Sequence, residues 1–205
     1  MKIYETKTAP NPRRVRMFLA EKGLLDEVEF VQIDLQKGEN LTPEYAAMNP
    51  MKKVPVLQLD DGTSIAETMA ICRYFEELHP DTTPLLGEDA IGKAHVEQWL
   101  RWIEFYLFLP TGMCFQHTTG YFKDRMNPIK EWGEECGKNV EKFFHFLDKH
   151  LADHEYICGD TFTAADINAF TTVAFNKVND IRIKPEQTHL QAWFDRIKAR
   201  PSAQV

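Results

Sequence analysis

A valine–proline pair, followed by a hairpin signal, is the feature that most constrains the fold of this chain. Val54-Pro55 precedes the apolar residues Val56-Leu57, and Asp60-Asp61-Gly62 then predicts a tight turn between two short strands. Proline has no N–H, so strand pairing is interrupted at Pro55. The backbone N–H and C=O of Val54 are therefore expected to be free to pair with an extended ligand.

A second element, Glu67-Thr68, lies where the next helix is predicted to begin. Free N–H groups and the positive end of the helix dipole at such a point bind a carboxylate. The Glu67 carboxylate can bind an ammonium group, so the two elements together fit a small zwitterionic peptide. The alternative is ordinary first-turn chemistry beside a structural X-Pro bond.

The first 79 residues alternate strands and helices. Residues 28–33 alternate apolar and polar side chains, which is typical of a half-buried strand, and residues 71–78 have apolar side chains at helical spacing. Short strands are also expected at 2–4, 56–59 and 63–65. The order βαβ-α-ββα resembles a thioredoxin-like α/β domain with a mixed four-stranded sheet.

The rest of the chain is predicted to be all-α. Apolar stripes predict helices over 96–107, with a kink at Pro110, over 136–151 and over 190–197, and Thr163 and Asp166 predict a capping box. Prolines at 80 and 84 indicate a linker. We therefore expect a thioredoxin-like domain at 1–79, a linker at 80–88 and an all-helical domain at 89–205.

Composition excludes several classes of function. The formal net charge is -7 with no long basic run, which argues against nucleic acid or an anionic membrane as the partner. No segment approaches eighteen consecutive apolar residues, so a cytoplasmic protein is expected. The four cysteines are widely separated and form no CxxC pair, which argues against a metal site or a disulfide framework.

Taken in order, these elements resemble the glutathione transferase family over essentially the whole chain. The resemblance is carried by residues 2–4, 12–23, 34–39, 49–50, 53–57, 67–68 and 159–167. It implies glutathione as co-substrate with no other cofactor, and a homodimer. It points to theta- and beta-related members, in particular to an atypical fungal and bacterial subgroup that lacks the usual Tyr, Ser or Cys beside the thiol.

The resemblance also implies which residues contact glutathione. The expected set is Asn40, Lys53, Val54, Pro55, Glu67 and Thr68. In this hypothesis Val54 aligns the peptide through its backbone and Glu67-Thr68 binds the γ-glutamyl end. Lys53 and Asn40 would meet the glycine carboxylate, with a simply solvated surface lysine as the alternative for Lys53.

Thiol activation is expected at the start of the first helix, where N–H groups and the dipole favour a thiolate. Serine-type relatives have their hydroxyl at or next to Ala9, and alanine cannot donate. Thr8 and Asn11 remain as nearby donors, whereas Tyr4 is expected to pack within its strand. Alternatively, Asn11 could cap the helix, with Pro12 at its first position.

A further candidate for the thiol is His117, together with Thr118. The resemblance to the atypical subgroup implies a histidine and a hydroxyl on this helix, and a histidine can hold a water or act as a base near neutral pH. The alternative is a histidine that interacts with the C-terminal dipole of a helix ending near Gly120.

An apolar pocket for the electrophile is expected from Tyr106, Met113 and Phe115, with Phe105 and Tyr121 nearby. Core packing is the alternative for each. The expected activity is conjugation of the glutathione thiolate to hydrophobic electrophiles. A glutathione-dependent disulfide reductase or dehalogenase, and a non-catalytic binding protein of the same fold, remain open.

Overall fold

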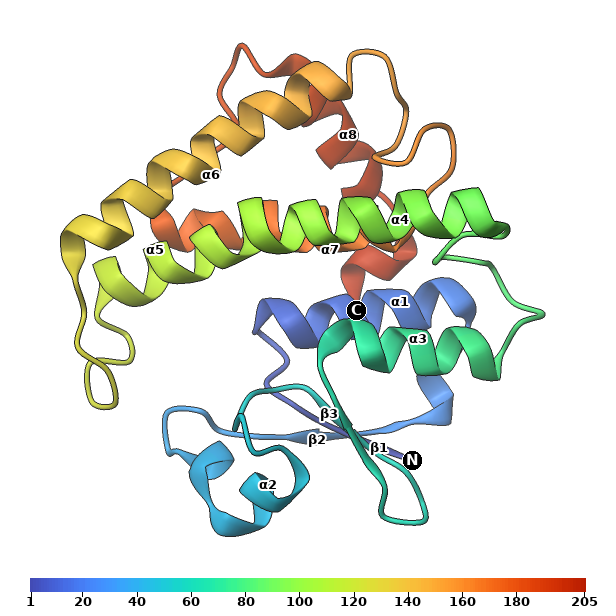
Figure 1. Cartoon of the computed structure of the whole chain (residues 1–205), viewed down its shortest axis with the longest axis vertical. Helices are drawn as coiled ribbons and strands as arrows, with labels where there is room; N and C mark the ends of the chain where they lie inside the picture. Colours follow the sequence, from blue (N-terminus) through green and yellow to red (C-terminus); the bar gives the residue numbers. More distant parts are fainter. The chain divides into compact units, whose positions relative to one another are not determined.

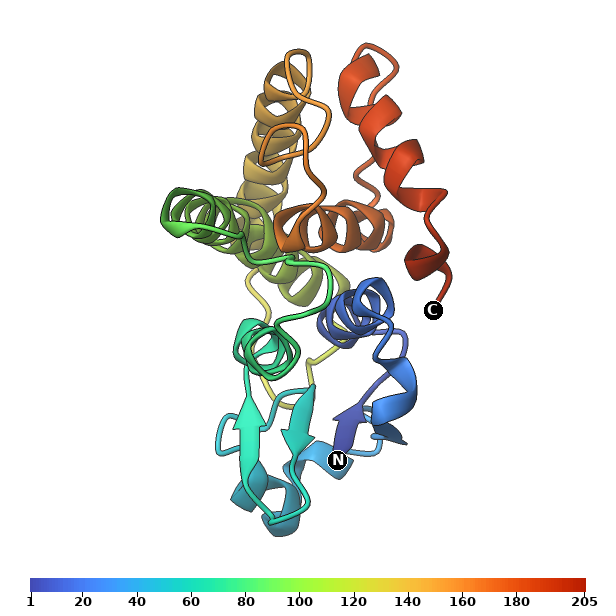
Figure 2. The same cartoon turned by 90° about the vertical axis from the view of Figure 1, so that its right-hand side faces the viewer.

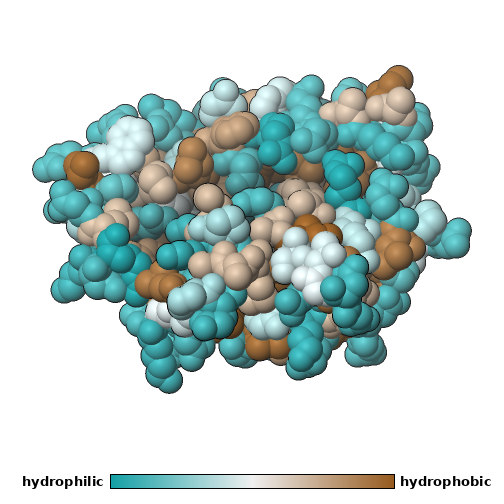
Figure 3. Space-filling view, turned by 60° about the horizontal axis from the view of Figure 1, so that its bottom comes forward, coloured by the Kyte–Doolittle hydropathy of each residue, from teal (hydrophilic) through white to brown (hydrophobic).

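The computed structural model describes residues 1–205 as two compact units (Figure 1). The first unit contains residues 1–85 and 201–205, and the second contains residues 86–200. None of the helices combines the length and the apolar character that crossing a membrane requires. On the face shown in Figure 3, hydrophilic residues predominate and strongly hydrophobic residues are scattered among them.

The first unit is a four-stranded mixed sheet with helices on both faces. Its elements are β1 (Lys2–Glu5), α1 (Pro10–Lys22), β2 (Glu29–Gln32), α2 (Pro43–Met48), β3 (Val56–Gln58), β4 (Ser64–Ala66) and α3 (Thr68–Leu78), with short 3₁₀ turns at Leu25–Glu27, Glu39–Leu41 and Pro201–Gln204. The strand order is β2-β1-β3-β4; β1 and β2 are parallel and the other pairs are antiparallel. Helices α1 and α3 lie on one face and α2 on the other (Figure 1). The predicted thioredoxin-like topology is confirmed.

The predicted hairpin joins β3 to β4. The Leu59 N–H donates to the Thr63 carbonyl at 2.8 Å, and the Thr63 N–H donates to the Asp61 carboxylate at 2.8 Å. Gly62 has a φ of +89°, a conformation that glycine adopts without a steric penalty. The turn therefore fixes the register of β3 against β4.

The second unit is all-helical, as predicted. Its elements are α4 (Ala90–Trp102), a π-helical stretch (Ile103–Phe108), α5 (Leu109–Thr119), α6 (Lys130–His150), α7 (Ala164–Phe175), a 3₁₀ turn (Asn176–Asn179) and α8 (Thr188–Lys198). Helix α6 packs against both α5 and α8, and Figure 2 shows α6 and α8 side by side. At the position of the predicted kink, the π-helical stretch ends just before Pro110. A wider turn accommodates a proline, which has no N–H and would clash with the preceding turn of a regular helix.

The predicted capping box begins α7 and is buried. The Asp166 carboxylate accepts hydrogen bonds from the Thr163 N–H at 3.0 Å, the Ile157 N–H at 3.0 Å and the Trp193 indole N–H at 2.9 Å. Asp166 has no exposed surface, and its burial raises the pKa of the carboxyl to about 6 although these donors favour the charged form. This carboxylate connects the start of α7 to the preceding loop and to α8.

The last residues of the chain belong to the first unit, whereas the sequence assigned everything after residue 88 to the helical domain. The Arg13 guanidinium donates to the Ala203 carbonyl at 2.9 Å, and the Ser202 hydroxyl donates to the Glu21 carboxylate. Ser202 and Ala203 are buried. Residues 80–85, assigned to the linker, also lie in the first unit. Segments as short as 80–85 and 201–205 have no hydrophobic periodicity. Their assignment to the first unit therefore depends on contacts with α1, which the sequence does not show.

Candidate functional site

The register of the sheet brings the predicted ligand-binding segments of the first unit to one end. The ladder of β1 with β3 ends at Tyr4 and Val56, and that of β3 with β4 ends at Val56 and Ala66. Thr6, Val54 and Thr68 each come two residues beyond these end pairs in the chain. The loop after β1, the start of β3 and the start of α3 therefore meet at this end of the sheet.

Val54 is anchored by its side chain and open along its backbone. Its side chain is buried with Tyr45 and Val56, and partly buried Tyr4 packs against this cluster. The Val54–Pro55 peptide bond is cis. Neither the N–H nor the C=O of Val54 makes a hydrogen bond within the chain. A peptide lying along Val54 would thus find a donor and an acceptor unpaired.

The loop before Val54 is fixed by three side chains. The Tyr45 hydroxyl and the Asn49 amide donate to the Lys53 carbonyl at 2.8 and 2.9 Å, and the Asn40 amide donates to the Lys52 carbonyl at 2.7 Å. Burial raises the pKa of Tyr45, so its phenol keeps the proton that it donates. The Lys53 side chain is exposed at the surface. The hydrogen bond from Asn40 to the Lys52 carbonyl shows that Asn40 positions this loop. Its contact with the glycine carboxylate of glutathione stays a prediction.

Glu67 is the residue immediately before α3. It has φ +73° and ψ 124°, its side chain is exposed, and it does not cap the helix. A left-handed φ is uncommon for a residue other than glycine, and such strained residues cluster at ligand-binding and active sites. Thr68, the first residue of α3, is 7% exposed and its N–H is one of the helix donors without a partner inside the helix.

The start of α1 has a single free backbone donor. Proline occupies positions 10 and 12 and has no N–H, and the Arg13 N–H donates to the Ala9 carbonyl at 3.3 Å. The N–H of Asn11 is the remaining one and makes no hydrogen bond. The buried Oδ1 of Asn11 also has no partner. The backbone N–H and the side-chain Oδ1 of Asn11 are thus available, one as a donor and the other as an acceptor, close in sequence to the loop of residues 6–9.

The interpretation of Asn11 as the helix cap is wrong. Helix α1 begins at Pro10, its N-cap is Ala9, and no side chain caps it. Proline is favourable throughout the first turn because the N–H groups there need no partner within the helix, so Pro10 joins the helix together with Pro12. Nearby, Thr8 is exposed and its hydroxyl has no partner. The Tyr4 hydroxyl donates to Gln58 at 3.0 Å, in keeping with packing inside the sheet.

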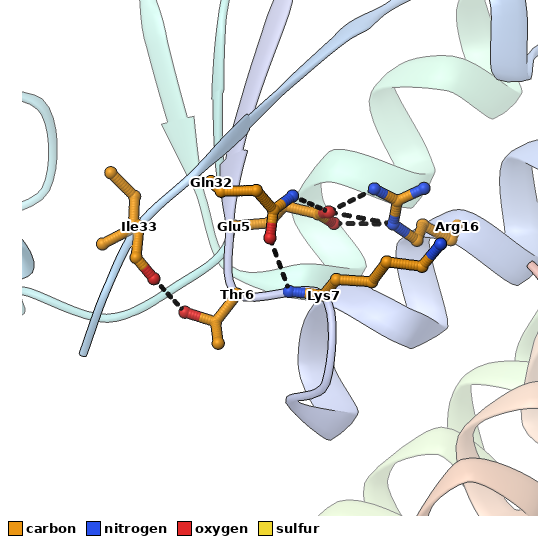
Figure 4. Close-up of polar contacts among 6 residues, drawn as sticks. All are labelled: Glu5, Thr6, Lys7, Arg16, Gln32 and Ile33. Atoms are coloured by element: carbon orange, nitrogen blue, oxygen red, sulfur yellow. Dashed lines mark hydrogen bonds and ion pairs between the residues drawn. The ribbon is translucent and has the colours of Figure 1, made fainter. Parts of the chain in front are cut away.

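A buried carboxylate next to this loop was missed by sequence reasoning. Glu5, the last residue of β1, has no exposed surface and accepts hydrogen bonds from the side chains of Arg16 and Gln32 (Figure 4). The signal in the sequence is weak: an acidic residue ends a strand, with a basic residue in the next helix. Glu5, Arg16 and Gln32 meet because β1, α1 and β2 pack together in the fold, and their spacing in the sequence does not indicate this.

His117 and Thr118 lie in the second unit, near the end of α5. The Ile129 N–H donates to His117 Nδ1 at 2.9 Å, so the neutral ring has its own proton on Nε2. In that state Nε2 is a hydrogen-bond donor, and the interpretation of neutral His117 as a base at this atom is wrong. The Thr118 hydroxyl donates to the Cys114 carbonyl at 2.7 Å. A Cβ added to Gly133 would lie 2.9 Å from the His117 Cβ, so this glycine allows α6 to approach.

The three residues expected to bind the electrophile do not share one surface. Tyr106, which is 61% exposed, lines a groove of about 420 Å³ together with Phe105, Phe143 and Phe146. Phe115 instead packs in an aromatic cluster, with ring centroids 5.2 Å from Tyr121 and 5.4 Å from Phe175. Met113 is partly buried and does not line the groove. Their role toward an electrophile stays a prediction.

Comparisons with known proteins agree with this architecture. The family models for the glutathione S-transferase N-terminal and C-terminal domains match residues 8–78 and 113–201. Glutathione S-transferase 2 of Saccharomyces cerevisiae is 38% identical over 205 residues, covering 98% of this chain and 87% of that protein. The crystal structure of Gtt2 from Saccharomyces cerevisiae superposes with a TM-score of 0.95 at 36% identity, covering 100% of this chain and 99% of the other. A glutathione S-transferase domain-containing protein from Marinobacter aquaeolei gives a TM-score of 0.92 at 36% identity, with 98% and 99% covered. On these grounds the chain belongs to the glutathione S-transferase family.

Proposed function

We propose that this chain binds glutathione in its first unit and transfers the glutathione thiolate to hydrophobic electrophiles. The observation that carries the proposal is the free backbone of Val54, at the end of the β3–β4 ladder where α3 begins. An extended peptide needs a main-chain donor and acceptor beside it, and its charged end needs a site of opposite polarity. Family membership supports the same function.

Each charged group of glutathione has a proposed partner. The γ-glutamyl carboxylate binds the Thr68 N–H and the dipole of α3, and the ammonium group binds the Glu67 carboxylate. The cysteine residue pairs with the backbone of Val54 beside Pro55. The exposed Lys53 side chain, next to Val54 in the chain, meets the glycine carboxylate, while Asn40 keeps that loop in place.

Thiol activation is proposed to depend on Asn11, with Thr8 as the less favoured donor. Lowering a thiol pKa by two units takes about 2.7 kcal/mol of selective thiolate stabilisation. Hydrogen bonds to a charged group contribute about 1.5–3 kcal/mol each, so the N–H of Asn11 and one side-chain donor suffice. His117 and Thr118 are the further candidates by resemblance. With its proton on Nε2, His117 would serve as a donor.

The proposed reaction is nucleophilic substitution or conjugate addition. In a substitution, the sulfur forms a bond to the electrophilic carbon, the leaving group departs with its electron pair, and the thiol proton goes to solvent. No further cofactor is needed for this chemistry. Tyr106, Met113 and Phe115 are proposed for the hydrophobic partner, whose size rather than identity an apolar pocket selects. A homodimer is proposed by family analogy, and sedimentation would test it.

Two measurements made together test this function. Glutathione is titrated into the protein while heat and the ultraviolet absorbance of the thiolate are recorded, and turnover is then compared between an aryl halide and a mixed disulfide. We expect binding, a thiolate signal below the ordinary thiol pKa, and aryl halide conjugation. Disulfide turnover alone would favour a reductase. Absence of binding at millimolar glutathione would contradict the proposal and favour a non-catalytic binding protein.

A further inference from the structure

The side chains of Glu5, Arg16 and Gln32, here named the Glu5 clamp, connect three elements of the first unit (Figure 4). The Arg16 Nε–H donates to both carboxylate oxygens of Glu5, each at 2.9 Å, and Nη2 donates to Oε1. The Gln32 amide donates to the same Oε1 at 2.7 Å. One carboxylate at the end of β1 thus binds α1 through Arg16 and β2 through Gln32.

The clamp also reaches the loop of residues 6–9. The Gln32 Oε1 accepts the Lys7 N–H at 3.1 Å, so the two ends of one amide connect the buried carboxylate to the loop backbone. Thr6 is fixed beside it, because its hydroxyl donates to the Ile33 carbonyl at 2.6 Å. The Ile33 N–H donates in turn to the Glu5 carbonyl at 2.6 Å. The first two residues of the loop are therefore bound to β2.

The far end of the loop is fixed by α1. Arg16 lies on this helix, and its guanidinium stacks on the Phe30 ring of β2, with the carbon at 3.8 Å from the ring centroid. The Ala9 N–H donates to the Thr6 carbonyl at 2.9 Å, which closes the loop into a turn just before Pro10. The Glu5 carboxylate thus contacts both Gln32, which binds the start of the loop, and Arg16, which lies on the helix that follows the loop.

A buried ion pair is a costly way to stabilise a fold. Replacing such a pair with apolar side chains of similar volume is often neutral or stabilising, because both charges lose their hydration on burial. What the pair supplies is fixed geometry, since a guanidinium and a carboxylate meet in a defined planar arrangement. The pair joins the end of β1 to α1, the two elements on either side of the loop that leads to the free N–H of Asn11. Catalysis is sensitive to displacements of about 1 Å.

We propose that Glu5, Arg16 and Gln32 are positioning residues that fix the loop of residues 6–9 so that Asn11 stabilises the glutathione thiolate. This inference rests on the function proposed above. None of the three side chains needs to touch the ligand. Their substitution should therefore change the ionisation of bound glutathione and kcat, while leaving KM for glutathione nearly unchanged.

Gln32→Met is the variant of choice. Methionine has a similar length and no strong hydrogen-bonding group, and Gln32 is an exposed residue of an edge strand, so the fold should survive. The matched control is Gln36→Met, because Gln36 is also exposed and its side chain makes no hydrogen bond. Arg16→Lys keeps the charge but loses the planar guanidinium. It should also raise the thiol pKa of bound glutathione and lower kcat.

We expect Gln32→Met to raise the thiol pKa of bound glutathione by about one unit, and to lower kcat about tenfold at a pH below that pKa. In the free protein, hydrogen exchange of the Lys7 amide should accelerate, because its acceptor is lost. KM of Gln32→Met for glutathione should stay as in the unmodified protein. In Gln36→Met, the thiol pKa, kcat and the exchange of the Lys7 amide should all be unchanged.

Each contrary result has a separate meaning. A lower melting temperature of Gln32→Met with an unchanged thiol pKa and kcat would show a purely structural role and overturn the positioning proposal alone. An unchanged exchange rate of the Lys7 amide would also overturn it, even without ligand. If the unmodified protein gives no thiolate signal with glutathione, the proposed function itself fails, and the inference fails with it.

Discussion

Val54 and Thr68 each lie two residues beyond the same end of the β3–β4 ladder, which ends at the pair Val56 and Ala66. Val54 has an unpaired backbone, and Thr68 begins α3 with a free N–H. The proposed peptide site is therefore made largely of main-chain groups. Substitutions other than proline leave such groups in place, so the mutational tests address the neighbouring charges.

Glu67→Ala should raise KM for glutathione by about tenfold or more, because the bound ammonium group loses its charged partner. Glu67→Gln is the matched variant, since it removes the charge and keeps the length. Steady-state kinetics at varied glutathione would measure both. The left-handed φ of Glu67 adds a second expectation. Glu67→Gly should weaken binding equally while preserving or increasing the melting temperature, and an unchanged KM in all three variants would remove Glu67 from the site.

Asn11→Ala should raise the thiol pKa of bound glutathione by about one unit, because it removes the side-chain amide but keeps the backbone N–H. Thr8→Ala is the control on the same loop, and its effect should be smaller because Thr8 is exposed. Thiolate absorbance against pH measures both variants. A larger shift in Thr8→Ala than in Asn11→Ala would reverse the assignment.

If His117 has the proposed donor role, His117→Ala should lower kcat by about tenfold with little change in glutathione affinity, because one hydrogen bond to a charged group is lost. Two further variants separate a donor from a base. Glutamine can place an N–H near the position of Nε2 and should retain most of kcat, whereas asparagine should behave like alanine. Nitrogen NMR of the ring should show the proton on Nε2. Equal losses in the glutamine and asparagine variants would contradict the donor role.

Stability should fall as the pH rises through the pKa of Asp166. Its folded-state pKa of about 6 lies above the ordinary value, so the folded state binds the proton more tightly than the unfolded state. The stabilisation is thus fully present below about pH 4 and is lost by about pH 7, a change of about 3 kcal/mol. Urea unfolding from pH 4 to 7 should show this slope.

Asp166→Asn should lack that pH dependence, because an amide does not titrate in this range. Asp160→Asn, at an exposed position nearby, is the control. The same slope in Asp166→Asn as in the unmodified protein would assign the pH dependence to another group.

The topology followed from local pattern, and so did the positions in the fold of the segments proposed to bind the peptide. Period-two alternation, the turn at Asp60-Asp61-Gly62 and the positions of Val54 and Glu67 depend on near neighbours in the chain, and the sheet and hairpin were correctly predicted. The start of α1 was misplaced by two residues. Two prolines fit the first turn equally well, and spacing alone cannot choose between them.

What local pattern could not supply is contact across the fold. The Glu5 clamp joins residues from two strands and a helix. The tautomer of His117 is set by the backbone of Ile129, which belongs to the segment before α6. The grouping of Tyr106 with α6 rather than with Phe115 likewise depends on packing. Each of these three features depends on how segments far apart in the sequence lie in space, and hydrophobic periodicity does not encode that.

The assignment of residues 201–205 to the first unit has a consequence for how the chain is made. A ribosome synthesises the α/β part first, yet the segment that covers α1 through Ser202 and Ala203 emerges only after every helix of the second unit. Folding during translation proceeds domain by domain from the N-terminus. The contacts of residues 201–205 with α1 can therefore form only after the whole second unit has been synthesised.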